Sequence, residues 1–384
     1  MGQDGPVSQP PPDAPRAIDD TPNAPPSMKL DKRKSIIAGL VAIVFLVVVF
    51  VTVIPKFGSY AEAWTAIQAM PPGSIATLVG ALLIYLFFYG WPFVASVPGL
   101  RYWQGQIVNE SAFTISNGVP AGGALGLGLQ YAQLATYGAS PTVATAGITA
   151  TGVWSIFITL GLPVLGVLAL VLGGDSAGSY YLSAAIGLGA LLAMIIVFAL
   201  ILRSETLARR IGGWADSLAA WFLRLIKRPG SVDLTSQVLK LREDIVGLVR
   251  RRWAAITAAQ LAVAFSQFGI LLVAMIGVSG GSLEGITYLE VFAAFAISQL
   301  GLMIPVTPGG LGTVDAAMIA LLVSFGADNG VATAAALVWR ASSFIPQIII
   351  GLICIGIWRL NARSGKTYRL KGDMPGEEAA SAQG

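Results

Sequence analysis

Histidine is absent from the 384 residues, and cysteine occurs once, at Cys354. Without histidine the chain has no His-based metal site and no Ser-His or Cys-His nucleophile, and one cysteine cannot form an internal disulfide. The glycine-rich runs do not end in the Gly-Lys-Ser/Thr of a nucleotide-binding loop. We therefore expect a protein that is not an enzyme, with no catalytic residue, metal or cofactor.

Charged residues are also scarce, at 11% of the chain, whereas hydrophobic residues make up 55%. The mean hydropathy is +0.73, far above that of a water-soluble domain. The composition predicts an all-α, polytopic integral membrane protein. Six apolar stretches are long enough to cross about 30 Å of hydrocarbon: 36–54, 74–97, 143–172, 180–202, 254–277 and 331–358. Two further apolar segments, 111–140 and 288–326, are interrupted near their middle.

The distribution of positive charge predicts the topology. Segment 203–252 contains eleven Lys and Arg against five Asp and Glu, and segments 29–34 and 359–371 are also basic. The remaining loops, 55–73, 173–179, 278–287 and 327–330, hold one Lys between them. The positive-inside rule then places both termini in the cytoplasm. Counting crossings from these fixed points, segment 111–140 enters and leaves from the inside, and segment 288–326 from the outside.

An internal repeat agrees with this topology. Residues 120–146 align with 308–334 at a constant offset of 188, with ten of 27 positions identical, where composition alone predicts about three. Because the copies face opposite ways, we predict an inverted-topology repeat, about 111–172 and 288–358. Each copy is a broken or re-entrant hairpin followed by a full span, as in the core of many transporters.

Each copy begins with contiguous helix breakers inside apolar sequence. Non-helical backbone at this depth is tolerated only where protein or a wet cavity covers it. The predicted substrate-binding residues are therefore those of the two breaks: Pro120, Gly122 and Gly123 in the first, and Pro308, Gly309, Gly310 and Gly312 in the second. Close helix packing is the alternative role for these glycines. It is the expected role for isolated ones such as Gly152 and Gly166.

Charges inside the apolar segments are few, and each is costly unless it is paired or hydrated. Asp315 and Arg340 are predicted to pair across the interior, with Arg340 either purely structural or able to hold a phosphate. Glu110 and Glu290 are expected to be interfacial and hydrated, and the alternative for both is a role as proton carriers. Five polar residues near the breaks either line a polar path or bond helix to helix: Gln130, Gln133, Ser298, Gln299 and Thr307.

Two terminal segments flank the predicted membrane domain, 36–360, and a basic segment lies within it. Residues 1–35 carry eight prolines and read as a disordered cytoplasmic tail, and 361–384 as a second cytoplasmic tail. Residues 205–229 have apolar positions at spacings of three and four among basic residues. This pattern predicts an amphipathic helix on an anionic lipid surface, or equally an ordinary connecting helix with a solvated basic face. Nucleic-acid binding is not supported, because topology already explains the basic residues.

The segment Ile304-Pro-Val-Thr-Pro-Gly-Gly-Leu-Gly-Thr-Val-Asp315, followed by Gly326 and Trp339-Arg340, resembles the lysylphosphatidylglycerol synthetase membrane-domain family, also called the flippase-like domain family. The resemblance covers roughly residues 36–360. It implies a bacterial inner-membrane protein that moves a lipid between leaflets. The chain stops at Gly384, without room for the aminoacyl-transfer domain of the synthetases. Pro120 is followed by Ala-Gly-Gly, where many relatives have Gly-Glu and then an Arg.

We therefore expect a lipid flippase of the plasma membrane that translocates a phospholipid or polyprenyl-linked lipid with an anionic or phosphate-bearing head group. The helix ends after Pro120 and Pro308 would offer backbone N–H groups to the phosphate. Arg340 would be the counter-charge and Asp315 its positioner, so both also belong to the predicted substrate-binding residues. The alternative is a non-transporting scaffold or accessory subunit of a cell-envelope lipid pathway. An enzyme acting on lipid-linked phosphate is the weaker third, because such chemistry usually needs clustered acids, His or a metal.

Overall fold

The computed structural model describes residues 60–118, 122–173, 234–283, 285–303 and 308–363, with scattered residues between 189 and 213. Every regular element in this part of the chain is a helix. Several predictions lie outside it: the span 36–54, both tails, most of the span 180–202, most of the amphipathic segment 205–229, and Pro120.

Among the described residues, four helical segments are long and apolar enough to cross a membrane: Pro72–Ser96, Pro141–Leu172, Val246–Val278 and Asn329–Ala362. The first combines α3 (Pro72–Tyr89) and α4 (Trp91–Ser96), and the others belong to α7 (Pro141–Leu172), α10 (Leu234–Val278) and α13 (Asn329–Arg363). They match the predicted spans 74–97, 143–172, 254–277 and 331–358. The chain is thus an all-helical integral membrane protein.

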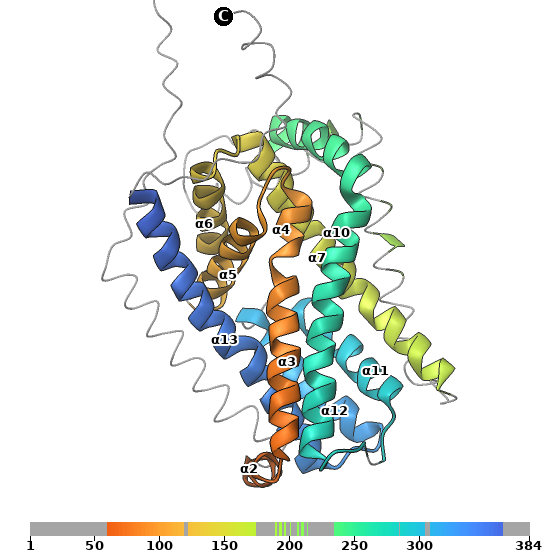
Figure 1. The fold of residues 1–384 in the computed structure, drawn as a ribbon. Helices are drawn as coiled ribbons and strands as arrows, with labels where there is room; N and C mark the ends of the chain where they lie inside the picture. Colours follow the sequence, from red (N-terminus) through yellow and green to blue (C-terminus); the bar gives the residue numbers. More distant parts are fainter. Residues whose placement is uncertain are drawn as a thin grey trace, which may run out of the picture.

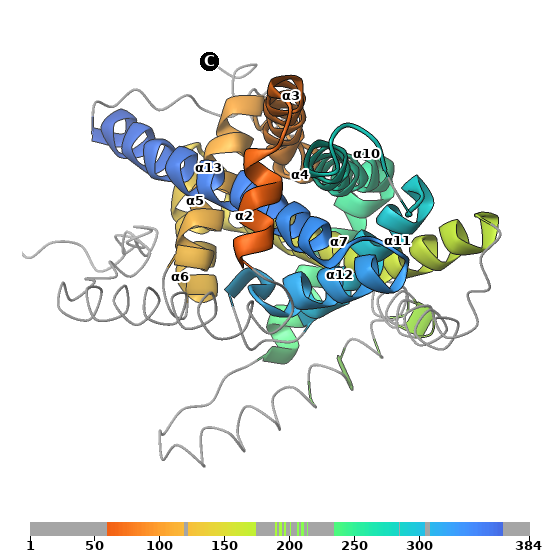
Figure 2. The same cartoon turned by 90° about the horizontal axis from the view of Figure 1, so that it is seen from below.

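Helices α3 and α10 lie side by side and antiparallel (Figure 1), and Figure 2 views both along their axes. At one end, the Met70 Cε atom lies 2.6 Å from where a Cβ on Gly277 would be. At the other end, Arg252 Nη1 donates to the carbonyl of Val94 at 3.3 Å. These contacts define two ends of the molecule: the α4 end, with Arg252 and the 97–101 loop, and the α2 end, with α2 (Tyr60–Gln68) and the 278–288 loop.

The first hairpin consists of α5 (Tyr102–Gly118) and α6 (Gly122–Thr136), which pack against each other. It is the predicted segment 111–140 with one correction, since its first arm begins at Tyr102. Hydropathy missed residues 102–110 of this helix because they include Gln104, Gln106 and Glu110. These polar side chains are buried against neighbouring helices, so they do not face lipid.

The second hairpin, predicted as 288–326, consists of α11 (Tyr288–Ser298), two short 3-10 turns and α12 (Thr313–Ser324). The turns are η4 (Gln299–Met303) and η5 (Pro308–Gly310). A reciprocal capping box starts α11: Thr287 Oγ1 accepts from the Glu290 N–H, and a Glu290 carboxylate oxygen accepts from the Thr287 N–H at 2.6 Å. Glu290 is half-buried at a helix start, and its interfacial position stays a prediction.

The two hairpins enter the molecule from opposite ends (Figure 1). The α5–α6 hairpin starts from the α4 end and the α11–α12 hairpin from the α2 end. Their tips meet halfway along α13. A Cβ on Gly309 would lie 2.6 Å from Asn117 Oδ1, and the rings of Phe113 and Phe344 are 5.1 Å apart. The main hydrophobic core lies where α10, α11, α12 and α13 pack together.

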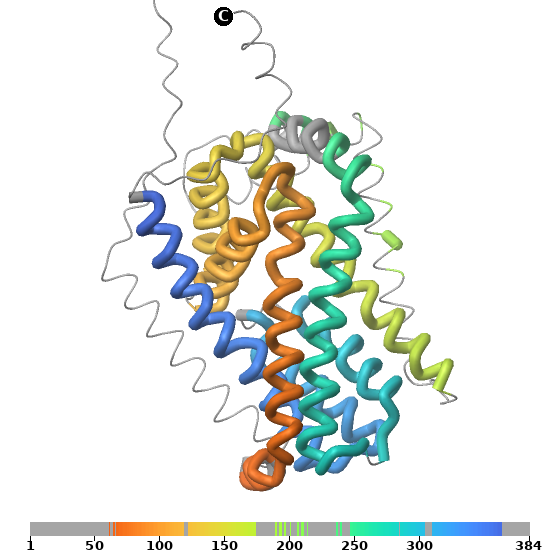
Figure 3. The backbone as a smooth tube through the Cα atoms, viewed as in Figure 1, coloured from red at the N-terminus to blue at the C-terminus, as the bar shows by residue number. Residues whose placement is uncertain are grey.

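The turns that leave the two hairpins have the same backbone structure at an offset of 188 residues. Gly138 and Gly326 both take positive φ, at 86° and 111°. Three backbone N–H to C=O bonds of 3.0–3.1 Å close each turn: Tyr137 to Gln133, Gly138 to Ala135 and Ala139 to Leu134 in the first, and Phe325 to Leu321, Gly326 to Val323 and Ala327 to Leu322 in the second. The spans after them, α7 and α13, run in opposite directions (Figure 3).

The helix starts after these turns also correspond. Ser140 caps α7, its hydroxyl accepting from the Val143 N–H at 3.3 Å. Asp328 caps α13, its carboxylate accepting from the N–H groups of Gly330 at 2.8 Å and Val331 at 3.1 Å. Both types are preferred N-caps. Identical residues at 188 intervals thus occupy matching places in two turns at opposite ends of the molecule.

Candidate functional site

Asp315 and Arg340 form the buried ion pair that the sequence predicts. Arg340 Nε donates to Asp315 Oδ1 at 2.7 Å, and both side chains are almost fully buried. The second carboxylate oxygen, Oδ2, accepts from the Gly312 N–H at 2.8 Å at the start of α12. Arg340 Nη1 also donates to the carbonyl of Gly309 at 3.4 Å. The pair therefore joins the broken tip of the second hairpin to the middle of α13.

Aromatic rings cover the guanidinium. Its central carbon lies 4.7 Å from the ring centre of Trp339 and 5.0 Å from that of Phe344, within the range of cation–π attraction. Among the described residues, Nη2 is the guanidinium nitrogen without a hydrogen-bond partner. The predicted pairing is confirmed. The predicted phosphate-binding role of Arg340 stays a prediction, with the Nη2 amino group uncommitted.

The second break is shaped by three glycines in the left-handed region. Gly309, Gly310 and Gly312 have φ of 62°, 66° and 84°, which ordinary side chains rarely adopt. Space is also short, because a Cβ on Gly310 would lie 2.7 Å from a Val314 methyl group and 2.9 Å from Leu302. Backbone geometry and packing thus explain these glycines, and Pro308 begins the turn that contains them. Their predicted contact with substrate stays a prediction.

The two described glycines of the first break have different surroundings. A Cβ on Gly122 would collide with the backbone carbonyl of Ile115, so Gly122 is where α5 and α6 approach most closely. A Cβ on Gly123 would meet nothing within 4 Å. Gly123 lines a polar cavity of about 470 Å³ beside the first hairpin.

This polar cavity lies between the first hairpin and the helices α3, α4, α7 and α10. Polar side chains on four helices line it: Asn109, Ser116, Gln130, Thr151, Ser155 and Gln260. None of the lining residues in the described chain carries a formal charge. Two of the amides are held in place, since Gln260 Nε2 donates to the Thr151 carbonyl at 3.0 Å and Asn109 Nδ2 to the Tyr89 carbonyl. The cavity therefore offers hydrogen bonds from neutral groups.

Gly152 also lines this cavity, which corrects its expected role in helix packing. A Cβ at Gly152 would meet nothing within 4 Å. The expectation holds for Gly166, where a Cβ would lie 3.0 Å from the Ala296 methyl group and 3.3 Å from the backbone of Ala293. Sequence alone does not separate a glycine facing a neighbouring helix from one facing a cavity.

The lining positions of the polar cavity on α6 and α7 can be compared with the residues 188 positions later. We call residues 111–172 the first half and residues 288–358 the second half. Seven of the lining positions, all on α6 and α7, correspond to residues that are almost fully buried, and four of the seven counterparts are larger. Gly123 corresponds to Leu311, Gln130 to Met318, Thr151 to Trp339, Leu127 to Asp315 and Gly152 to Arg340. Asp315 and Arg340 thus stand at sequence positions that correspond to two lining residues of the cavity, Leu127 and Gly152.

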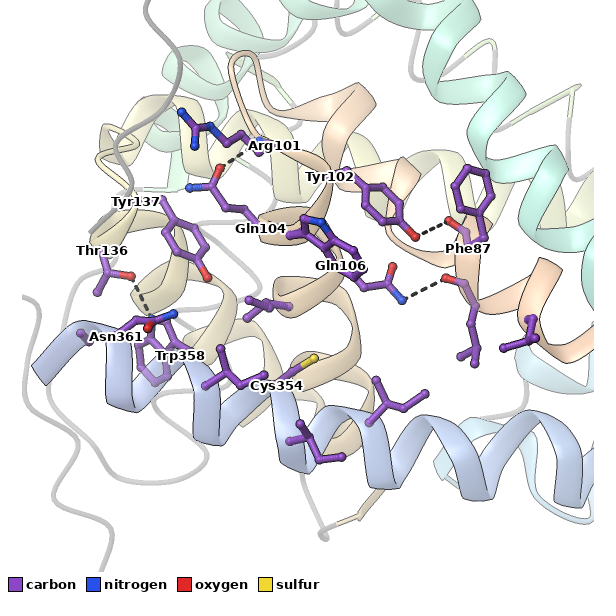
Figure 4. A pocket seen from close by; sticks show the side chains of 18 residues that line it. Phe87, Arg101, Tyr102, Gln104, Gln106, Thr136, Tyr137, Cys354, Trp358 and Asn361 are labelled. Atoms are coloured by element: carbon purple, nitrogen blue, oxygen red, sulfur yellow. Dashed lines mark hydrogen bonds between the residues drawn. The ribbon is translucent and has the colours of Figure 1, made fainter. Parts of the chain in front are cut away.

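A second, larger depression of about 870 Å³ lies on the other side of α5, between α3 and α13 (Figure 4). We call it the apolar groove. Much of its wall is apolar: Leu83, Leu86, Phe87, Ile107, Ile350, Ile353 and Ile357. Ile353 is 55% exposed, as are neighbours of similar type on α13. In a membrane protein such a wall is typical of a surface in contact with lipid tails.

Polar groups gather toward the α4 end of the apolar groove. Figure 4 shows Arg101, whose backbone N–H donates to Gln104 Oε1 at 2.9 Å. Tyr102 donates its hydroxyl to the Phe87 carbonyl at 2.9 Å, and Trp358 Nε1 donates to Thr136 Oγ1 at 2.9 Å. The groove therefore has an apolar body with a polar and basic end.

Other polar residues predicted near the breaks have separate places. Gln130 lines the polar cavity. Gln133 is buried and donates to Ser111 Oγ at 3.1 Å, and Ser298 donates to the Phe295 carbonyl at 2.8 Å, so these two serve internal bonding. Gln299 is buried, and Thr307 lies outside the described residues. Glu110, expected at the interface, is fully buried, because α13 and α3 cover this part of α5.

The cavity residues Asn109, Ser116, Thr151 and Gln260 were not predicted from the sequence. Each is a single neutral polar residue in an apolar helix, which helix packing usually explains. The available signal was the repeat itself. Gly152 stands at the position of Arg340, so the first half has no cation where the second half has one.

The family comparison agrees with this architecture. The model of the family described as "Lysylphosphatidylglycerol synthase TM region" matches residues 36–351, which is most of the chain. No curated protein matches the chain. The matched range contains both hairpins, the polar cavity and the Asp315–Arg340 pair. The chain belongs to the lysylphosphatidylglycerol synthase transmembrane-region family.

Proposed function

We propose that this protein moves a membrane lipid between leaflets, and that the polar cavity receives the head group. The observation that carries the proposal is the contrast between the two segments: Leu127 and Gly152 line a polar cavity of about 470 Å³, whereas the corresponding residues, Asp315 and Arg340, form a buried ion pair. Amides and hydroxyls suit phosphate and sugar oxygens alike, so the proposed substrate is a lipid with a phosphate-bearing head group. The family supports a lipid-related role in the membrane.

The apolar groove supports the other half of this assignment. A lipid has a polar end and long apolar tails, and α5 separates a polar cavity from an apolar groove. Helix α5 belongs to a hairpin and does not cross the full thickness of the protein. We propose that the tails stay along α3 and α13 while the head group passes beside the hairpin tip, where Asn117 and Gly309 meet.

We further propose an inverted-topology repeat in the plasma membrane, with the α4 end in the cytoplasm. The matching turns at Gly138 and Gly326 lie at opposite ends and support this. Single cysteines in a Cys354→Ala background test it in intact cells. Ser282→Cys should react with an impermeant thiol reagent and Ser236→Cys should not. The reverse pattern would invert the orientation, and labelling of both would refute the charge-based topology.

Liposome reconstitution tests lipid movement. Purified protein is inserted into vesicles with fluorescent lipids of different head groups, and an impermeant reductant bleaches the outer leaflet. Active protein makes the protected inner pool accessible. The decisive variant is Leu127→Asp with Gly152→Arg, which builds the ion pair of the second half into the polar cavity. We expect lipid movement to stop while the protein stays monodisperse.

The matched control is Gly356→Leu, on an exposed face of α13 where an added Cβ meets nothing within 4 Å. It should move lipid at the wild-type rate. Wild-type transport by the filled-cavity variant would show that the cavity is not the route. Absence of transport by the wild-type protein with every head group would favour the alternative, a non-transporting scaffold or accessory subunit.

A further inference from the structure

Glu110 lies near the middle of α5 with no exposed surface. It faces helix α13, where a Cβ on Gly351 would collide with the Glu110 backbone carbonyl. One turn further along α5, Thr114 donates its hydroxyl to the carbonyl of Gln347, at 3.3 Å. The carboxyl group is therefore enclosed by protein at a depth set by the middle of a membrane-crossing helix.

The hydrogen bonding of Glu110 is incomplete. Oε1 accepts from Gln106 Nε2 at 3.1 Å, and the same nitrogen donates to the Leu86 carbonyl at 2.9 Å. Oε2 is buried with no partner among the described residues, and no ion pair to Glu110 occurs there either. Both amide atoms of the fully buried Gln347 are likewise unpartnered.

The titratable groups around Glu110 are mainly hydroxyls and a thiol. Helix α3 contributes Tyr85 and Tyr89, both also neighbours of the Gln347 amide. Among the described residues, Tyr102 on α5 and Cys354 on α13 are the other titratable groups in the surroundings of Glu110. Arg340 acts on Tyr85 but is bound to Asp315. Helix α4 and the η5 turn contain no titratable residue, and on α6 the Tyr131 hydroxyl bonds Thr145.

Asp315 shows what an ionised carboxylate needs at this depth. It has a guanidinium at 2.7 Å and a backbone N–H on its second oxygen. Glu110 has no guanidinium partner and no backbone N–H on its second oxygen. It accepts one hydrogen bond, from the Gln106 amide, which also bonds the Leu86 carbonyl. An unpaired buried carboxylate is strongly unfavourable, so such a group is neutralised by binding a proton. The binding step is R–COO⁻ + H⁺ → R–COOH, with no electron transfer and no leaving group.

The path from the apolar groove to Glu110 is short. Its partner Gln106 lines the apolar groove, which continues to the polar and basic end around Arg101. We propose that Glu110 is a proton-binding site, loaded through the Gln106 side of the groove and emptied toward the opposite side of the membrane when lipid moves, so that its proton couples lipid movement to a pH gradient. The coupling rests on the proposed function, whereas the proton site does not.

A carbodiimide tests the site without any transport assay. An apolar carbodiimide reacts with protonated carboxyl groups inside membranes, adding the acid across its C=N bond with no leaving group. The intact protein in liposomes is treated over a pH series, and modified peptides are identified by mass spectrometry. We expect modification at Glu110 that falls about tenfold per pH unit once the carboxyl ionises. Asp315, held by Arg340, should stay unmodified.

Glu110→Gln keeps the shape of the neutral acid and cannot bind a proton. It should abolish the adduct at this position while the protein stays monodisperse, and Glu290→Gln, a half-buried capping residue, should change neither readout. In liposomes that move lipid, an imposed pH gradient should speed wild-type movement several-fold and leave Glu110→Gln unaffected.

No adduct at Glu110 at any pH would overturn the proton site. An adduct at Glu110 with gradient-independent movement would overturn the coupling. Movement driven by a sodium gradient at constant pH would also overturn it, in favour of a metal cation. An adduct at Glu110 in a protein that moves no lipid would leave the proton site standing and refute the proposed function, so the two can fail separately.

Discussion

The two halves of this protein, about residues 111–172 and 288–358, have matching turns and helix caps, but one half is tightly packed and the other encloses a cavity. In the second half, Trp339, Met318 and the Asp315–Arg340 pair fill the space between the hairpin and its following span. In the first half, the corresponding positions are Thr151, Gln130, Leu127 and Gly152, and a cavity remains. Two segments with matching turns can thus differ in a few side chains, and in this protein one segment is packed at those positions whereas the other lines a cavity.

The largest expected effect comes from breaking the packed half. Arg340→Ala leaves the Asp315 carboxylate buried without its cation, and we expect a loss of about 3–5 kcal/mol in the free energy of unfolding. Asp315→Leu combined with Arg340→Met should recover most of it. Thermal unfolding in detergent measures both. Strictly additive losses in the double variant would mean that the pair is not coupled as the 2.7 Å contact implies.

If the recovered double variant still fails to move lipid, Arg340 acts on the head group as well as on the fold. If it recovers transport too, the pair is purely structural. This outcome decides between the two roles that the sequence left open for Arg340.

The next largest effects are expected at two glycines of α7, one packed and one facing the cavity. Gly166→Leu forces a side chain against Ala293 and Ala296 and should cost about 1–3 kcal/mol. Gly152→Leu points into the polar cavity, where an added Cβ meets nothing within 4 Å, and should leave stability nearly unchanged while lowering lipid movement. Stability and transport are measured on the same samples. Equal loss of stability at both positions would mean that the cavity is not open.

A smaller effect is expected at the matching turns. Gly138→Ala imposes a side chain on a backbone with φ of 86° and should cost about 1 kcal/mol. Gly326→Ala should cost more, because its Cβ would also collide with the carbonyl of Gly285. Unfolding midpoints of the two variants give the order. A larger loss at Gly138 would contradict the described geometry.

The smallest effect is expected at the caps. Ser140→Ala removes one hydrogen bond to the start of α7 and should cost about 0.5–1 kcal/mol. Asp328→Ala removes two N–H contacts from α13 and should cost slightly more. Asp328→Ser, which keeps an N-cap oxygen, serves as the control and should lose less than Asp328→Ala in the same unfolding assay.

Much of the fold followed from sequence because the bilayer limits the choices. Four predicted spans match helices within a few residues at most ends, and both interrupted segments are hairpins. The boundary that went wrong, the start of α5, fails for a physical reason. Gln104, Gln106 and Glu110 lower the hydropathy of a turn that protein, and not lipid, surrounds.

For the candidate site too, some features could be predicted from the sequence and others could not. Asp315 and Arg340 could be paired from sequence, because two opposite charges in apolar segments must find each other. The roles of Gly122 and Gly123 could not be separated, although one touches a neighbouring backbone carbonyl and the other opens on the cavity. Composition reports how small a residue is, and only its neighbours show whether the space beside it is occupied.

By itself, the sequence determined that the chain enters a membrane, which segments are helical, where helices break, and that two charges need each other. These follow from hydropathy, glycine and proline geometry, and the cost of burying charge. The tertiary structure alone decided that the tips of both hairpins meet beside α13, that Glu110 is buried, and that Gly152 opens on a cavity. These properties depend on which surfaces face each other across the fold.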